Sequence, residues 1–300
     1  MNKTLIVVVG PTAVGKTKTC LKLAQHYKSA IVSADSRQFY KEMNIGTAKP
    51  NQEELQLAQH YLINHLSIHQ PYTVKDFEQD ALEAISQIHG VSDIAILAGG
   101  SGLFVKAVCE GLDAIPDIPA SYRNDLIRKY EEKGAEPLLR QLQLLDPTYY
   151  EAVDRSNIQR VIRALEVINY TQQPFSAFRQ NKKKKRPFNI IKIGLTLPRE
   201  TLYERIDARM DEMIDSGLFE EAMSLYPFKS LNALQTLGYS EIFRYLDNEY
   251  DKEEAVRLLK RNSRRYAKRQ FTWFNKDPEI TWFLPDEVDD IIRHIDAFLR

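Results

Sequence analysis

Short apolar segments alternate with longer amphipathic segments over the first hundred residues of the chain. The apolar segments are rich in β-branched residues, which is typical of strands buried on both faces of a parallel sheet, and they cover 5–9, 30–34 and 94–98. The segments between them have the spacing of amphipathic helices, at 18–27, 52–66 and 74–89. Strands and helices that alternate in this way predict an α/β fold with a parallel sheet.

The pattern changes near Leu112. No segment from 115 to 180 has a convincing strand pattern, and amphipathic helices separated by prolines are predicted at 126–132, 136–145 and 158–169. A strand pattern returns at 189–197, and long helices are predicted at 201–225 and 252–274. The simplest interpretation is an α/β core formed by residues 1–112 and 188–300, interrupted by an all-helical insertion at 113–187.

The composition is that of a folded protein and excludes several classes. Hydrophobic residues make up 43% and charged residues 27% of the 300 positions, which is ordinary for a globular chain. No apolar run approaches the roughly 20 residues of a membrane span, and the N-terminal run is too short for a secretory signal. We therefore expect a cytoplasmic protein. The two cysteines, Cys20 and Cys109, exclude a disulfide framework and a CxxC zinc site.

A phosphate-binding motif follows the first predicted strand and opens the first predicted helix. It consists of Gly10, Pro11, Thr12, Ala13, Val14, Gly15, Lys16 and Thr17. Its glycines allow backbone N–H groups to converge on phosphate oxygens, and the helix presents its N-terminus to the same anion. Lys16 supplies a charge to a terminal phosphate, and Thr17 is placed to bind Mg²⁺. We therefore predict a P-loop NTPase-like core.

The motif specifies an anion but no reaction. A nucleotide hydrolase usually has an Mg²⁺-ordering Asp at the end of a second strand, yet the strand at 94–98 continues into GGSG without an acid. Asp35, after the second predicted strand, is the better candidate acid. Because strand C-termini share one edge of a parallel sheet, we expect residues 10–17, Asp35 and Ser101 to converge, with Asp35 as a proton acceptor. A helix cap at Asp35 and a plain glycine-rich turn at Ser101 are the alternative interpretations.

Further segments resemble one family, the tRNA dimethylallyltransferases (isopentenyltransferases), and span nearly the whole chain in the family's order. They are GPTAVGKT (10–17), SADSRQFYKEMNIGTAKP (33–50), GGSGLF (99–104), IQRVIRALEV (158–167), LYERIDARMDEMIDSGL (202–218), TLGYSEI (236–242) and YAKRQFTWF (266–274). The resemblance implies transfer of a dimethylallyl group from dimethylallyl diphosphate to N6 of the adenosine 3′-adjacent to the anticodon. It also implies tRNAs that read codons beginning with U.

The resemblance implies roles for individual residues in catalysis. Asp35 matches the general base on the adenine amino group, and Ser101 occupies the family's Thr position. Lys16 and Thr17 match the diphosphate and Mg²⁺ positions. Arg205 and Arg209 resemble arginines that meet the departing diphosphate, and their i, i+4 spacing predicts one helix face. A surface salt bridge with Asp207 or Glu212 is the alternative for this pair.

The resemblance also implies contacts with the anticodon stem-loop of tRNA. A stacked base has to flip out to reach such a site, and the residues expected to bind it are Asp35, Ser36, Arg37, Gln38 and Ser101. The family segment that contacts tRNA corresponds here to Gln159, Arg160, Val161, Ile162 and Arg163, together with Arg123 in the insertion. Val161 and Ile162 also have the spacing of buried helix positions. We expect a monomer that needs no obligate protein partner and no membrane.

The formal net charge of zero conceals an uneven distribution. Twenty of the 41 basic residues lie in three segments without acids, at 1–34, 179–192 and 255–276. In the last segment the basic residues have the spacing of one helical stripe, formed by Arg257, Lys260, Arg261, Arg264, Arg265, Lys268 and Arg269. Because a solvated face normally includes acids, we predict that this stripe contacts an RNA backbone. For Lys182–Lys185 a solvated linker is the alternative to RNA contact.

Two other functions remain open at this point. A small-molecule kinase, or an isopentenyltransferase acting on free adenine nucleotide, would explain the phosphate motif but neither the basic stripe nor the helical insertion. A non-catalytic RNA-binding module would tolerate loss of Asp35.

Overall fold

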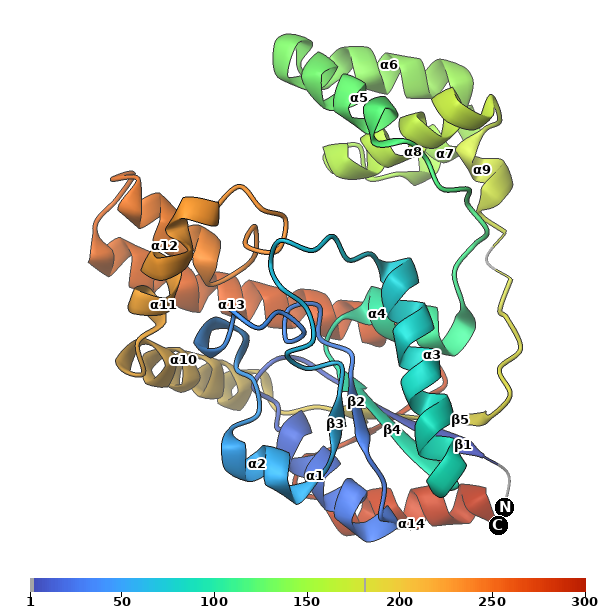
Figure 1. Ribbon diagram of the computed structural model, residues 1–300, viewed down its shortest axis with the longest axis vertical. Helices are drawn as coiled ribbons and strands as arrows, with labels where there is room; N and C mark the ends of the chain where they lie inside the picture. The colour runs from blue at the N-terminus through green and yellow to red at the C-terminus, as the bar shows by residue number, and fades with distance from the viewer. Residues whose placement is uncertain (1–2, 181) are drawn as a thin grey trace. The chain divides into compact units, whose positions relative to one another are not determined.

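The computed structural model describes residues 3–180 and 182–300 (Figure 1). The chain forms two compact units, one of residues Met1–Cys109 with Lys185–Arg300 and the other of Glu110–Lys184. The second unit begins and ends three residues before the insertion predicted at 113–187. No helix in the described ranges is both long and apolar enough to cross a membrane.

The first unit contains a parallel sheet of six strands in the order β3-β2-β4-β1-β5-β6. The strands are β1 (Thr4–Val9), β2 (Ile31–Ser33), β3 (His60–Tyr61), β4 (Ile94–Gly99), β5 (Asn189–Leu195) and β6 (Ile280–Phe283). The central strand β1 is buried along its whole length, because alternate residues enter hydrophobic cores on the two faces of the sheet. The predicted α/β fold class is confirmed.

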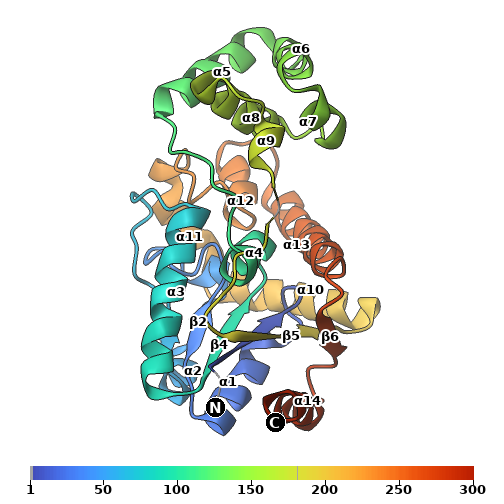
Figure 2. The ribbon, with the colours of Figure 1, turned by 90° about the vertical axis from the view of Figure 1, so that its right-hand side faces the viewer.

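Helices cover both faces of this sheet. They are α1 (Lys16–Tyr27), α2 (Gln52–Leu57), α3 (Val74–Val91), α4 (Gly102–Glu110), α10 (Arg199–Asp215), α11 (Leu218–Leu225), α12 (Tyr239–Leu246), α13 (Lys252–Phe274) and α14 (Val288–Leu299), with short 3₁₀ turns η1 (Ile45–Thr47) and η2 (Tyr226–Phe228). One core joins β1 to α3, α11, α12 and α13, and the other joins it to α1, α10 and α14. Figure 2 shows α14 beside α1 at one end of the unit.

Two predicted helices are wrong in length. The helix predicted at 52–66 ends at Leu57, and the chain then forms the edge strand β3. The helix predicted at 201–225 is interrupted at Gly217, which has a φ of 100° and starts α11 in a new direction. The helix end at Gly217 matters for the site, because α11 then packs against η1.

Among its described residues, the second unit contains helices and no strand. Its helices are α5 (Ala120–Lys133), α6 (Glu136–Leu145), α7 (Pro147–Ala152), α8 (Ile158–Thr171) and α9 (Phe175–Phe178). Helix α8 supplies most of the core and packs against α5 and α6. The buried Asp146 connects α7 and α9, because its carboxylate accepts hydrogen bonds from the backbone N–H groups of Tyr149 (3.0 Å) and Ser176 (2.7 Å).

Candidate active site

The loop between β1 and α1 has the geometry that a phosphate-binding loop requires. Gly10 and Gly15 have φ values of 150° and 114°, and a Cβ atom on Gly10 would lie 2.6 Å from the carbonyl oxygen of Leu195. No other residue therefore fits at position 10. The Lys16 ammonium folds back over the loop and donates hydrogen bonds to the carbonyl oxygens of Gly10 (2.9 Å) and Pro11 (2.7 Å).

The charge of Lys16 is held in an unfavourable environment. Burial, and to a lesser degree the positive charge of Arg209, lower the pKa of Lys16 to about 8, although Asp35 acts in the opposite direction. The guanidinium of Arg209 in α10 is within 3.3 Å of the Thr12 hydroxyl, and burial lowers its pKa as well. Two desolvated cations at one loop form a site that an anion such as a diphosphate stabilises.

Asp35 and Ser101 converge on this edge of the sheet, as predicted from the parallel topology. Asp35 follows β2, and its carboxylate accepts a hydrogen bond from the backbone N–H of Arg37 (2.9 Å). The Ser101 hydroxyl, after β4, accepts one from the backbone N–H of Ser36 (3.0 Å). The two turns touch because Gly99 has no side chain, and a Cβ there would lie 2.2 Å from the carbonyl oxygen of Ala34.

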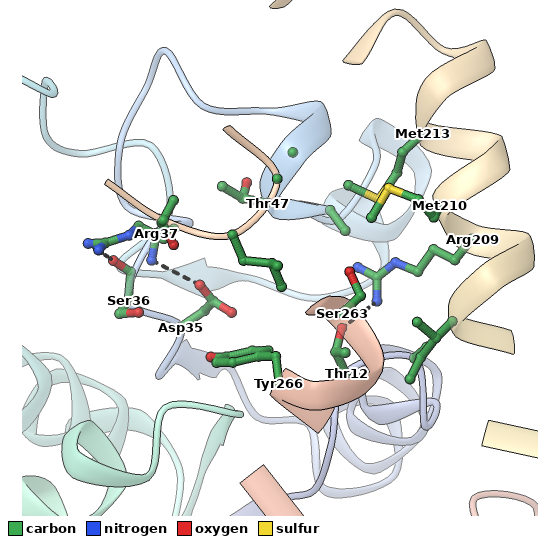
Figure 3. Close-up of a pocket in the computed structure, with 17 residues that line it drawn as sticks. Thr12, Asp35, Ser36, Arg37, Thr47, Arg209, Met210, Met213, Ser263 and Tyr266 are labelled. Atoms are coloured by element: carbon green, nitrogen blue, oxygen red, sulfur yellow. Dashed lines mark hydrogen bonds between the residues drawn. The ribbon is translucent and has the colours of Figure 1, made fainter. Parts of the chain in front are cut away.

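Two cavities meet at Asp35. The larger has a volume of about 120 Å³ and is shown in Figure 3; its lining includes Thr12, Ala13, Asp35, Ser36, Arg37, Gly46, Thr47, Ala48, Ile206, Arg209, Met210, Met213, Ser263 and Tyr266. The smaller, of about 70 Å³, is lined by Lys16, Thr17, Asp35, Gln38, Gly99 and Gly100 among others. Asp35 therefore borders both the phosphate-binding loop and a larger chamber with methionine side chains in its wall.

The residues of the smaller cavity fit a magnesium ion. Thr17 and Asp35 both line it, and hydroxyl and carboxylate oxygens are the hard ligands that Mg²⁺ prefers. In the described ranges no cluster of three or more His, Cys, Asp and Glu side chains forms a dedicated metal cage. Magnesium commonly binds one or two protein oxygens and completes its shell with substrate phosphates and water, which is the arrangement that these two residues allow.

Comparison with known proteins agrees with this geometry. Residues 38–277 match the family model described as IPP transferase. The chain belongs to the IPP transferase family. It is 47% identical over 300 residues to a tRNA dimethylallyltransferase of Cytophaga hutchinsonii, covering 100% of this chain and 99% of that one, and 49% identical over 287 residues to one of Christiangramia forsetii, covering 96% and 95%.

A solved structure has the same architecture as this IPP transferase family member. The full-length tRNA isopentenylpyrophosphate transferase of Bacillus halodurans is 38% identical, with a TM-score of 0.73 and coverage of 98% of this chain and 96% of that one. The P-loop NTPase-like fold that the sequence predicted for this family member is thereby confirmed.

The structure separates the two arginines that the sequence placed together. Arg209 enters the larger cavity, whereas Arg205 is exposed and lies outside that cavity's lining. The alternative of a salt bridge with Asp207 is not realised for either arginine, because Asp207 binds Arg264 of α13 at 2.5 Å through both carboxylate oxygens. Arg209 is therefore the residue that this family member can bring to a diphosphate, and Arg205 stays a prediction.

Helix α13 carries two site residues that sequence reasoning missed. The buried Gln270 accepts a hydrogen bond from the backbone N–H of Thr12 (2.8 Å) and donates one to the carbonyl oxygen of Gly100 (3.0 Å). One turn earlier, Tyr266 lines the larger cavity and is hydrogen-bonded to Ser101, and burial raises its pKa to about 12. Both residues lie within the family-matching segment YAKRQFTWF (266–274), but that segment did not indicate which groups they bind.

Two residues predicted to contact RNA need correction. Val161 and Ile162 are fully buried in the core of the helical unit, so their side chains cannot reach RNA in this structure. The Gln38 amide binds the protein, because its Nε2 lies 3.3 Å from the carbonyl oxygens of both Thr47 and Ala48, and its contact with a flipped base stays a prediction. Ser36 and Arg37 do line the larger cavity.

The basic stripe of α13 is free of acids in sequence but not in space. Three of its seven residues form ion pairs, Arg257 with Glu254, Lys260 with Asp211 and Arg264 with Asp207. Two of these acids belong to α10, so the sequence argument, which considered only acids within residues 255–276, was wrong on this point. Arg265, Lys268 and Arg269 are exposed, and the prediction of RNA contact now rests on these three residues.

The helical unit groups the other predicted tRNA-contacting residues around one carboxylate. Glu166 is buried, and its two oxygens bind Arg163 (2.5 Å) and Arg123 (3.3 Å). Arg123 also donates a hydrogen bond to Gln159 (2.5 Å), while Arg160 is exposed. A buried carboxylate that fixes two half-exposed arginines preorganises them for an external anion.

Proposed function

We propose that this protein transfers a dimethylallyl group from dimethylallyl diphosphate to N6 of the adenosine 3′-adjacent to the anticodon in tRNAs that read codons beginning with U. The observation that carries the proposal is the position of Asp35, which borders both the phosphate-binding cavity and the larger chamber. A proton acceptor at this junction can serve a nucleophile that attacks a carbon attached to the bound diphosphate. The names of the relatives supply tRNA and the dimethylallyl group, whereas the diphosphate donor and the target adenosine are part of the proposal.

The chemistry follows from the charges around the loop. The allylic C–O bond breaks with its electron pair leaving on the diphosphate, where Lys16, Arg209 and the N-terminus of α1 stabilise the developing charge. The adenine N6 forms the new C–N bond, and Asp35 accepts the proton that N6 loses. Thr17 would hold Mg²⁺, whose contribution when bound is charge neutralisation on the phosphate oxygens.

Other residues orient the reacting groups. Ser101 fixes the turn that carries Asp35, because its hydroxyl accepts the Ser36 N–H. Gln270 ties the phosphate-binding loop to the turn before Ser101. We propose that Ser36 and Arg37, which line the chamber, bind the flipped adenine. Since the substrate is tRNA and no step needs a second chain, we propose a monomer that works in the cytoplasm.

The proposal is tested by incubating the protein with unmodified tRNA, dimethylallyl diphosphate and Mg²⁺, and by mass spectrometry of the digested nucleosides. We expect N6-dimethylallyl adenosine, and none from a tRNA with guanosine at the target position. Product on free AMP but not on tRNA would favour the free-nucleotide alternative, and phosphate transfer from ATP would favour a kinase. Tight tRNA binding without any product, in wild-type protein and an Asp35→Ala variant alike, would indicate a binding module.

We propose that Arg123, Gln159, Arg160 and Arg163 of the helical unit bind the tRNA backbone, as does the exposed Lys268 of α13, whereas Arg264 is paired with Asp207. Replacing Arg123 with Gln should raise the tRNA dissociation constant about tenfold. It should also lower the slope of log affinity against log salt concentration by about the amount expected for one phosphate contact. The turnover number at saturating tRNA should stay unchanged. Binding titrations at several salt concentrations measure both effects.

The matched control for this prediction is Arg140→Gln. Arg140 is an exposed arginine of α6 in the same unit, paired with Glu136 at i, i+4, and it is not among the residues proposed to contact tRNA. Equal loss of affinity in both variants would mean that tRNA affinity depends only on the net charge of the helical unit and not on the position of Arg123.

A further inference from the structure

The segment 44–48 forms one wall of the larger cavity, and Gly46, Thr47 and Ala48 line it. The segment is built on the single 3₁₀ turn η1, whose residues are half-buried and none fully buried. Short turns without fully buried residues open locally at low free-energy cost unless other elements hold them. The position of this wall beside Asp35 therefore depends on groups outside the segment.

A carboxylate from α11 holds the wall from behind. The side chain of Glu221 accepts three consecutive backbone hydrogen bonds, from Asn44 (3.0 Å), Ile45 (2.8 Å) and Gly46 (2.9 Å). Successive N–H groups that point at one anion form a nest, and bonds to an ionised acceptor are stronger than those between neutral groups. The Glu221 carboxylate is thus the anion of this nest.

Tyr239 connects the same carboxylate to a second wall of the cavity. Its hydroxyl donates a hydrogen bond to Glu221 (2.6 Å), and its ring lies so close to Gly46 that a Cβ atom there would come within 2.5 Å of it. Tyr239 is fully buried and directly follows the turn Thr236–Gly238, which also lines the cavity. Glu221 therefore fixes the spacing between two walls.

The segment 44–48 is also held by the turn that carries Asp35. Gln38, three residues after Asp35, donates to the carbonyl oxygens of Thr47 and Ala48. The wall is consequently attached to the Asp35 turn on one side and to Glu221 on the other, and Figure 3 shows Thr47 beside Asp35 in the cavity.

We infer that Glu221 is a positioning residue for the transfer reaction: it sets the wall at 44–48 and the Thr236–Gly238 turn at the separation that the acceptor adenine needs. The inference rests on the proposed function. It assigns no chemical step to Glu221, which lies outside the cavity lining. Its effect is therefore on the alignment of N6 with the allylic carbon, and errors of about 1 Å in such alignment can cost roughly a hundredfold in rate.

The test begins with Glu221→Gln, which keeps the size of the side chain but replaces one acceptor oxygen with an NH₂ group. Three N–H donors and the Tyr239 hydroxyl then compete for one oxygen, so the wall loosens. We expect kcat to fall by about 10- to 100-fold, while KM for dimethylallyl diphosphate and the tRNA dissociation constant change less than about threefold. Glu220→Gln, an exposed neighbour in the same helix, is the control and should match the wild type.

Hydrogen exchange supplies a readout that does not need activity. In Glu221→Gln the amides of Asn44, Ile45 and Gly46 should exchange at least about tenfold faster, with those of α11 unchanged. If these amides exchange faster in Glu221→Gln but the wild type makes no dimethylallyl adenosine, the proposed function is wrong, while the role of Glu221 in holding the segment 44–48 is correct. Unchanged protection in a folded variant, or unchanged kcat in an assay in which the wild type is active, would overturn the inference.

Gly46→Ala and Tyr239→Phe distinguish positioning from simple stabilisation. Gly46→Ala pushes the segment 44–48 away from the Tyr239 ring and should lower kcat as Glu221→Gln does. The Gly46→Ala/Glu221→Gln double variant should be no slower than the slower single variant, because both substitutions disturb the same contact between this segment and the Glu221–Tyr239 pair. Fully additive losses would indicate a separate structural role for Glu221 and overturn the inference. If Glu221→Gln does not fold, Tyr239→Phe removes only the hydroxyl and should still lower kcat about threefold or more.

Discussion

Replacing Asp35 with asparagine should lower the turnover number for dimethylallyl transfer by about 10²- to 10⁴-fold without unfolding the protein. The asparagine oxygen can still accept the Arg37 N–H that Asp35 binds at 2.9 Å, so the turn after β2 should keep its shape. What the variant loses is a group that can take the proton from adenine N6. The effect should therefore fall on the chemical step and not on binding.

A single-turnover measurement with excess protein over tRNA isolates that step. The tRNA dissociation constant and the thermal midpoint of the variant should stay close to those of the wild type. Asp215→Asn, at an exposed position near the end of α10, is the control. A variant at position 35 that reacts within about threefold of the wild type would mean that Asp35 is not the proton acceptor.

Replacing Lys16 with methionine should make the protein less active but more stable. Loss of its charge at the diphosphate should lower kcat/KM by about 10²- to 10³-fold. Yet burial and the Arg209 charge lower the pKa of Lys16 to about 8, so holding this ammonium group costs folding free energy at neutral pH, and the variant is relieved of that cost. Misfolding cannot produce a gain in thermal midpoint together with a loss of activity.

The stability difference between the wild type and Lys16→Met should depend on pH. The unfolded chain keeps the Lys16 proton up to its ordinary pKa of 10.5, whereas the folded protein releases it near pH 8. Between these values the unfolded state binds more protons, so wild-type stability rises with pH relative to the variant, and the stability difference fades above pH 10.5. In the same window kcat/KM of the wild type should fall, because the free enzyme loses the charge.

Chemical denaturation and kcat/KM, measured from pH 6 to 10, test both effects. Lys18→Met, at an exposed position of the same helix, should change neither. A stability difference between wild type and Lys16→Met that stays constant with pH would contradict the assignment.

Much of the fold and the central part of the site could be predicted because their causes are local. The phosphate-binding loop needs two glycines and a helix N-terminus within the eight residues that follow a strand, and all of these are visible in sequence. The convergence of Asp35 and Ser101 required one further rule, that parallel strands present their carboxyl ends at the same edge. Helix α13 was predicted with its observed bounds, Lys252–Phe274, since its amphipathic pattern is long and uninterrupted.

The errors have a common physical cause. The basic stripe lacked acids in sequence, but α10 brings Asp207 and Asp211 to it. A helix was predicted across Gly217, although its positive φ turns α11 toward the segment at 44–48. In both cases a periodic pattern identified a helix correctly in part, while the partner of each helix face came from a distant segment.

The sequence by itself determined the α/β architecture, the phosphate-binding loop and the position of Asp35 at the same edge of the sheet as that loop. Each of these depends on backbone geometry or side-chain chemistry within a few residues, or on the general topology of parallel sheets. Only the tertiary structure decided which of two arginines meets the loop, and that Gln270 and Glu221 hold the cavity walls. These roles depend on hydrogen bonds between residues far apart in the chain, such as the 2.8 Å bonds from Thr12 to Gln270 and from Ile45 to Glu221. Local sequence patterns do not indicate which distant residues form such pairs.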